Sequence, residues 1–89
     1  MEVRYRQSFL KDLKKLKGSS VYPRIYEIVF TTLSEAQNLQ DLPKIKAMQG
    51  YSNRYRIRVG DYRIGIEISD NTVEVIRTLH RKEFYRYFP

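Results

Sequence analysis

The chain has 89 residues and no cysteine, and its seventeen Lys and Arg against ten Asp and Glu give a net charge of +7. This length fits a single small domain, residues 1–89, and the absence of cysteine excludes disulfides and thiolate catalysis. We find no apolar run long enough to span a bilayer and no signal-peptide pattern, so we expect a cytoplasmic protein with no membrane partner. Arginines interleaved with eight tyrosines favour nucleic acid as the partner.

The first third of the chain predicts one strand and two helices. Residues 1–6 alternate as a short strand does, and Ser8 would cap a helix with the apolar stripe Phe9, Leu10, Leu13 and Leu16, ending before Gly18. Ser19, Ser20 and Pro23 mark a second helix start. Its apolar residues recur at helical intervals: Tyr22, Ile25, Tyr26, Val29, Leu33 and Ala36. The β-branched run 28–32 would also fit a strand, and residues 37–52, with Pro43 and Gly50, predict a loop.

Residues 54–67 predict a hairpin around which the rest of the chain is organised. They alternate on both sides of Gly60-Asp61, which suits a type II′ turn. One face is then apolar, and the other gathers Arg54, Arg56, Arg58 and Arg63 around Gly65. Opposed like charges weaken a sheet, and a glycine inside a strand leaves room for a ligand. This second face is therefore either a solvated surface or a cleft that holds phosphates.

A third strand is predicted over residues 72–79, after a tight turn at Asp70-Asn71. A two-residue turn would pair Ile68 with Val73 and Ile66 with Val75. The same register would put Thr78 beside Arg63, with His80 one step further on that side. The tail, residues 81–89, would form a short helix. The fold class is α+β: a strand, two helices and a three-stranded antiparallel meander in one sheet, with helices on one face and arginines on the other.

The available chemistry is metal-free. One histidine and no cysteine give no zinc cluster, no Ser-His-Asp array is signalled, and the scattered carboxylates read as surface groups. Arginines could stabilise the charge of a phosphodiester transition state, and His80 could exchange a proton near neutral pH. A turn histidine without catalytic duty is the competing interpretation of His80.

Two motifs then resemble a known family. Tyr55-Arg-Ile-Arg-Val-Gly-Asp-Tyr-Arg63 and His80-Arg-Lys-Glu-Phe-Tyr85-Arg look like the RelE toxins of the RelE/ParE superfamily. Phe9 to Leu16 and Leu42-Pro43-Lys44 before Gly50 fit the same family. The resemblance implies a toxin of a toxin–antitoxin pair that cuts messenger RNA in the ribosomal A site. The 2′-hydroxyl would attack its own phosphate, with no metal or other cofactor. An antitoxin protein, messenger RNA and small-subunit ribosomal RNA are the implied partners, and the oligomeric state stays open.

The resemblance also implies residue roles. Arg63 would stabilise the transition-state phosphate, Arg81 would assist the phosphate or leaving group, and Tyr85 would stack on or orient the substrate. Arg56 and Arg58 stand where well-known members carry lysines, one of which is thought to be the general base. Because arginine hardly deprotonates, either His80 takes the proton, or the arginines act by charge alone, or Lys44 or Lys46 is the base. The cations expected to bind RNA are Lys11, Lys14, Lys15, Lys17, Lys44, Lys46, Arg54 and Lys82.

Two other functions remain open. A ParE-like toxin shares the fold and poisons DNA gyrase without chemistry of its own, but it usually lacks the tail tyrosine with the arginine and histidine before it. All three are present here. The second alternative is a non-catalytic basic module that binds RNA or a protein. Gyrase inhibition would identify the first, and binding without cleavage products the second.

Overall fold

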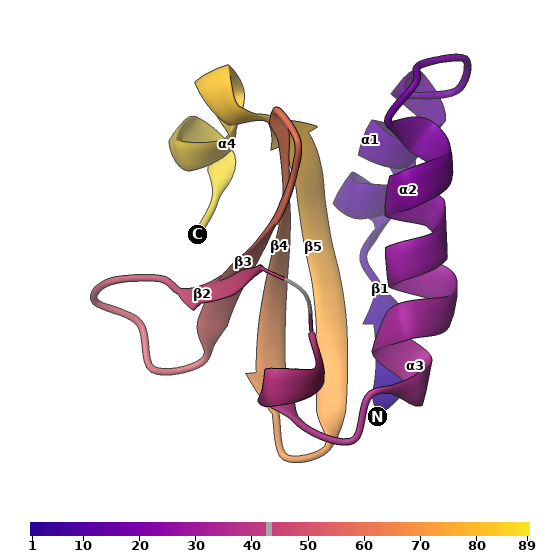
Figure 1. The fold of residues 1–89 in the computed structure, drawn as a ribbon. Coiled ribbons are helices and arrows are strands. Elements are labelled where there is room, and N and C mark those ends of the chain that lie inside the picture. The colour runs from indigo at the N-terminus through magenta and orange to yellow at the C-terminus, as the bar shows by residue number, and fades with distance from the viewer. Residues whose placement is uncertain (43) are drawn as a thin grey trace.

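The computed structural model describes residues 1–42 and 44–89, which are organised around a five-stranded mixed sheet in the order β1-β5-β4-β3-β2. Strands β3 to β5 form the predicted antiparallel meander, and β1 lies parallel to β5 (Figure 1). The predicted α+β fold is thus confirmed in its element order. The strands are β1 (Glu2–Tyr5), β2 (Ile45–Ala47), β3 (Arg54–Val59), β4 (Tyr62–Ser69) and β5 (Thr72–His80).

The prediction of a loop over residues 37–52 is wrong in part. This segment contains a 3-10 turn, Leu39–Asp41, and strand β2, which pairs antiparallel with β3 through Ile45–Ile57, Lys46–Arg56 and Ala47–Tyr55. A strand this short carries too few residues for its alternation to be visible in the sequence. Pro43, one of the residues that predicted the loop, lies outside the described residues.

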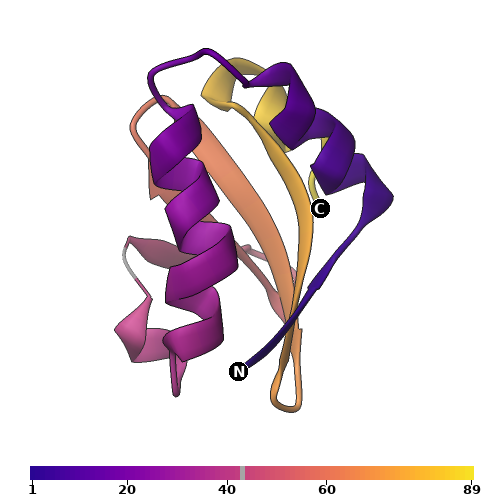
Figure 2. The ribbon, with the colours of Figure 1, turned by 90° about the vertical axis from the view of Figure 1, so that its right-hand side faces the viewer.

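Two helical elements cover one face of the sheet. Helix α1 (Gln7–Lys15) follows β1, and α2 (Tyr22–Glu27) continues through a π-helical segment, Ile28–Thr32, into α3 (Leu33–Glu35). Figures 1 and 2 show α1 and the α2–α3 rod side by side on this face. No helix in the described part of the chain is long and apolar enough to cross a membrane. The fully buried core side chains between helices and sheet are Phe9, Ile25, Val29, Leu33, Ile57, Ile64, Ile66, Val73 and Val75.

Of the residues predicted to start the two helices, one is confirmed by the structure and one is not. Pro23 stands in the first turn of α2, as predicted. Ser8 is not the N-cap of α1: Arg6 holds that position, and the Ser8 hydroxyl instead donates to the carbonyl oxygen of Ile76 at 2.7 Å. The run 28–32 is helical because Val29 and Leu33 continue the stripe that the sheet buries, and this packing outweighs weak β propensity.

The first hairpin has the predicted register throughout, from Val59–Tyr62 to Arg54–Glu67. Gly60 has a φ of +58°, as its turn position requires. The second hairpin also begins as predicted, with Ile68–Val73 and Ile66–Val75.

A β-bulge then changes the register of the second hairpin. It lies between Gly65 and Ile66 of β4 and leaves Ile76 unpaired in the register. Beyond it Leu79 lies opposite Arg63, and His80 lies opposite Tyr62. The prediction that Thr78 and His80 flank Arg63 is therefore wrong, because one extra residue moves all that follow to the other face.

The second face of the sheet is not a bare arginine surface. Helix α4 (Arg81–Tyr87) lies across it, opposite α1 to α3 (Figure 1), so helices do not occupy one face only. Phe84 and Phe88 are buried there with Ile76. A Cβ on Gly65 would stand 2.7 Å from the Phe88 ring, so the space that this glycine leaves is filled by the chain itself.

Candidate active site

Several basic side chains share the sheet face that α4 partly covers, and four of them lie in two directly opposed pairs. Arg58 lies directly opposite Arg63, and Lys46 of β2 lies directly opposite Arg56. Directly opposed residues of antiparallel strands project from the same face, so these four form one cluster. Arg58 and Lys46 are exposed, while Arg56 and Arg63 are half-buried. The cluster concentrates positive charge at the β3–β4 hairpin.

Arg63 is held by the turn of that hairpin. Its Nη1 donates to the carbonyl oxygens of Gly60 at 2.8 Å and Tyr62 at 2.9 Å. Its Nε is buried and finds no partner among residues 1–42 and 44–89. A half-buried guanidinium fixed at one nitrogen is suited to an anion such as a phosphate, which it can meet through its exposed part and not through the buried Nε.

Arg81 and Tyr85 come to this region through α4. The backbone N–H of Arg81 donates to the carbonyl oxygen of Asp61 at 2.8 Å, and its Nε lies 3.6 Å from Asp61 Oδ1. These contacts tie the start of α4 to the turn that holds Arg63. The Tyr85 ring stands edge-on to Phe84 with its centroid 5.0 Å away and is 56% exposed, which leaves it open to a ligand.

His80 lies apart from the arginine cluster. Its ring meets Tyr62 edge-on at 5.3 Å, on the side of the sheet away from Arg63. Its Nδ1 accepts the backbone N–H of Lys82 at 3.1 Å and caps α4. A ring nitrogen that accepts a hydrogen bond carries no proton, so the neutral ring bears its proton on Nε2.

The residues expected to bind RNA are divided among different places. Arg54 is already engaged, with its Nε 3.2 Å from Glu67 Oε2 and its guanidinium 5.7 Å from the Phe88 ring centroid. Lys44 precedes β2 with a φ of +50° and accepts the backbone N–H of Arg58 through its carbonyl oxygen at 3.3 Å. Lys11, Lys14, Lys15 and Lys17 are exposed on or just after α1, across the sheet from the arginine cluster. Lys82 lines a cleft with Lys15.

Sequence reasoning missed a buried ion pair that joins α1 to β5. Asp12, only 5% exposed, accepts hydrogen bonds from Arg77 Nε at 2.7 Å, Arg77 Nη2 at 3.0 Å and the Thr78 N–H at 3.1 Å. The Asp12 bond raises the pKa of Arg77 above its ordinary value. The Arg77 guanidinium also lies 5.3 Å from the Tyr87 ring centroid of α4. A signal was present, since Asp12 follows Phe9 by three residues and therefore lies on the inward face of α1.

Comparisons with known proteins agree with this architecture. The family described as "ParE toxin of type II toxin-antitoxin system, parDE" matches residues 3–85. The chain belongs to the RelE/ParE toxin superfamily of type II toxin–antitoxin systems. Toxin RelE3 of Methanocaldococcus jannaschii is 44% identical to this chain over 90 aligned residues, and the alignment covers 100% of both chains.

Solved structures of toxins show the same fold. The RelB-RelE antitoxin-toxin complex from Methanococcus jannaschii matches with a TM-score of 0.77 at 44% identity, covering 97% of this chain and 99% of that one. The RelBE2 complex of Mycobacterium tuberculosis matches with a TM-score of 0.70 at 28% identity, covering 90% and 96%. The fold alone is shared with YafQ of E. coli, at a TM-score of 0.71 and 17% identity over 91% and 93% of the two chains. The chain is a RelE-family toxin.

Proposed function

We propose that the protein is a metal-free messenger RNA endonuclease that acts in the ribosomal A site and thereby stops translation. The observation that supports this most directly is Arg58 lying opposite Arg63 on adjacent strands. Opposed like charges weaken a sheet, so their presence is best explained by an anion between or above them. Together with membership of the toxin superfamily, the arginine cluster favours a phosphodiester substrate.

In this proposal the ribose 2′-hydroxyl attacks the adjacent phosphorus, and the 5′-oxygen of the next nucleotide leaves. Arg63, held by the turn, stabilises the extra negative charge of the transition state, and Arg56 and Arg58 add to the field. Arg81 assists at the phosphate or leaving oxygen, and exposed Tyr85 stacks on or orients the nucleotide. The products are a 2′,3′-cyclic phosphate and a free 5′-hydroxyl.

Lys46 is the better-placed proton acceptor. It lies directly opposite Arg56 on the arginine face, whereas the Nδ1 of His80 is engaged with the backbone of Lys82 on the other side of the sheet. In the neutral form an amine accepts a proton from the 2′-hydroxyl. We therefore assign the base to Lys46 in this proposal and the capping of α4 to His80.

An antitoxin is the proposed protein partner. The related toxins of Methanococcus jannaschii and Mycobacterium tuberculosis were solved as complexes with their antitoxins. A chain of net charge +7 whose sheet ends in the edge strands β1 and β2 suits an acidic segment that folds on binding.

The deciding experiment is single-turnover cleavage of one end-labelled message, with and without programmed ribosomes. We expect efficient cutting on ribosomes and little on free RNA, because orienting the attacking hydroxyl is worth up to roughly 7–11 kcal/mol in reactions of this kind. The upstream product should end in a 2′,3′-cyclic phosphate, and cutting should withstand a chelator at levels that leave the ribosome intact. Equal rates in both settings would contradict ribosome dependence.

Gyrase poisoning is the second candidate, favoured by the match to the ParE family description. The same protein preparation should be assayed for inhibition of DNA supercoiling. Inhibited gyrase without RNA products would replace the endonuclease proposal. RNA binding with neither activity would indicate the non-catalytic basic module instead.

A further inference from the structure

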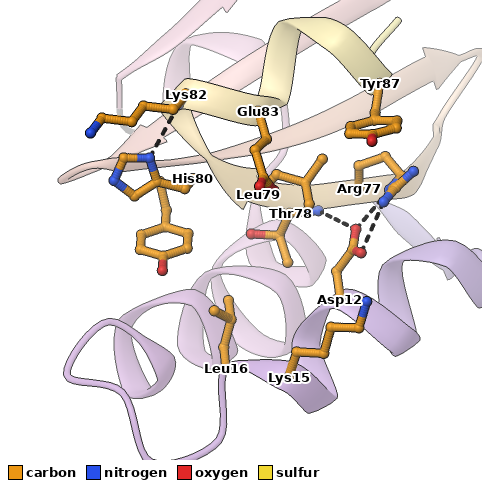
Figure 3. A pocket seen from close by; sticks show the side chains of 11 residues that line it. Asp12, Lys15, Leu16, Arg77, Thr78, Leu79, His80, Lys82, Glu83 and Tyr87 are labelled. Carbon is orange, nitrogen blue, oxygen red and sulfur yellow. Dashed lines mark hydrogen bonds and ion pairs between the residues drawn. The ribbon is translucent and has the colours of Figure 1, made fainter.

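A cleft of about 670 Å³ opens beside strand β5 (Figure 3). Strand β1 pairs with β5 only as far as Val75, so the second half of β5 is an open edge. Helix α1 lies on one side of this edge and α4 on the other, and the cleft lies between them. Its volume falls within the roughly 300–1,000 Å³ typical of sites for small ligands.

The walls of the cleft combine flat, apolar and charged groups. Tyr62 and His80 form an aromatic wall, with their rings nearly perpendicular at 79°, and Leu16 and Leu79 add apolar surface. Lys15 and Lys82 stand at the rim of the cleft on opposite sides (Figure 3). This combination of an aromatic wall and cations is typical of sites that hold a nucleotide out of its stack.

Two polar groups of the lining have no partner among the described residues. Of the acids, Asp12 is committed to Arg77 and the Thr78 N–H, whereas Glu83 makes no ion pair or side-chain hydrogen bond in residues 1–42 and 44–89. Thr78 is 1% exposed, and its hydroxyl is buried at the floor without a partner in the same residues. Glu83 is exposed to solvent, so a ligand with adjacent hydrogen-bond donors can reach its carboxylate without displacing a protein partner, whereas the Thr78 hydroxyl is covered by protein.

We propose that this cleft binds one guanine nucleotide of single-stranded RNA, an inference that rests on the proposed RNA-cutting function. The base enters the cleft against Tyr62 and His80, and its phosphates stay at the rim with Lys15 and Lys82. A carboxylate such as Glu83 accepts two parallel hydrogen bonds from adjacent donors. At the Watson–Crick edge only guanine presents such a pair, N1–H and the 2-amino group. Glu83 thereby selects guanine.

The charges of the cleft weigh against other ligands. A bare phosphate in its depth would face the Glu83 carboxylate, and a basic peptide would meet Lys15 and Lys82. The position also suits a bound RNA strand. His80 and Lys82 line the cleft, while Arg81 between them contacts Asp61 in the turn that holds Arg63. A strand that crosses this junction would place one base in the cleft and a neighbouring phosphate near the arginine cluster.

The test is an NMR titration of the full chain with the four ribonucleoside 5′-monophosphates. We expect GMP to shift the amide signals of Thr78, Leu79 and Glu83 and to bind more tightly than AMP, CMP or UMP. Glu83→Gln should weaken GMP binding at least about tenfold, the effect of removing one bidentate interaction with a base, and abolish the preference for GMP. Glu27→Gln, which changes an exposed helical glutamate far along the chain, is the matched control and should leave binding unchanged.

The titration needs neither ribosomes nor cleavage, so the two proposals fail separately. Three outcomes would each overturn the guanine site and leave the endonuclease proposal standing. They are GMP-induced shifts confined to the arginine face, equal affinity for all four nucleotides, and GMP binding that Glu83→Gln leaves unchanged. Selective binding through Glu83 in a protein that cuts no message would support the site and contradict the endonuclease proposal.

Discussion

Arg63 makes some contacts that stabilise the fold and others that destabilise it. It faces Arg58 and has a buried Nε without a partner in the described residues, yet its Nη1 donates twice to the hairpin turn. These effects offset one another, so we expect Arg63→Ala to change the free energy of unfolding by no more than about 0.5 kcal/mol. Cleavage on ribosomes should be lost.

Thermal unfolding and single-turnover cleavage check the Arg63 prediction. Arg4→Ala is the control, because within residues 1–42 and 44–89 the Arg4 side chain pairs only with Glu2 of the same strand, at 3.0 Å. An Arg63→Ala protein that unfolds at room temperature, or that cuts at the wild-type rate, would contradict the role of Arg63.

His80 offers a way to separate capping from proton transfer. Asparagine is among the best N-cap residues, so His80→Asn should keep α4 capped, whereas His80→Ala should lower the free energy of unfolding by about 1 kcal/mol. If His80 only caps α4, His80→Asn should retain cleavage, while Lys46→Gln should lose roughly 10²-fold or more, as expected on losing a general base. The single-turnover cleavage rates of the three variants distinguish capping from proton transfer. A comparable loss with His80→Asn at saturating toxin, with unchanged stability, would return the base to His80, whereas a loss confined to subsaturating toxin would reflect the place of His80 in the proposed cleft.

At the scale of elements, α4 is attached to the sheet by specific contacts on both of its sides. Phe88 packs where Gly65 has no side chain, and Arg77 stacks on Tyr87 while bound to Asp12 of α1. Because Tyr85 lies on this same helix, its position depends on these packing contacts. A change where α4 packs on the sheet is therefore expected to move Tyr85.

Gly65→Ala tests this dependence. The new Cβ would overlap the Phe88 ring at 2.7 Å, so the ring and the end of α4 must move. We expect the free energy of unfolding to fall by about 1–3 kcal/mol, as in other overpacked sites, and cleavage to fall with it. Adding Phe88→Leu should recover part of both losses, because a smaller side chain leaves room for the methyl group. Denaturant unfolding and cleavage rates are the measurements, and an unaffected Gly65→Ala single variant would contradict the packing.

Prediction from sequence succeeded for elements whose pattern is local and failed where the outcome depends on distant packing. The hairpin register followed from alternation around Gly60-Asp61. The bulge at Ile76 carries no comparable local signal, yet it decides which face receives Thr78 and His80. The same alternation correctly put Arg56, Arg58 and Arg63 on one face, whereas the filling of Gly65 by Phe88 required knowing where α4 folds back.

At the scale of the whole molecule, basic residues occupy both sides of the sheet. Arg56, Arg58 and Arg63 lie on one side, and the α1 lysines lie on the other. A single RNA strand bound at the arginines does not need the α1 lysines. Apart from Lys15, which lines the proposed nucleotide cleft, we therefore expect the α1 lysines to contact ribosomal RNA and the arginines to contact the message.

Lys11→Gln with Lys14→Gln tests this division. Both lysines are exposed, and neither lines the cleft of Figure 3. We expect a raised KM for programmed ribosomes with little change in kcat. The dependence of apparent affinity on salt should also become shallower, by up to roughly one unit of the log–log slope for each phosphate that the variant no longer neutralises. A fall in kcat alone would indicate that α1 acts on the chemical step.

The parallel pairing of β1 with β5 also fixes when the molecule can assemble. Glu2 lies opposite Thr72 and Tyr5 opposite Val75, so the first strand joins the sheet only after the last strand exists. The β3–β5 meander is built from short loops and can form quickly, whereas β1 and α1 must find partners some seventy positions away. While the chain is being synthesised, the apolar stripes of α1 and α2 therefore have no sheet to cover. We therefore expect the chain to complete its fold only after β5 has emerged from the ribosome that makes it.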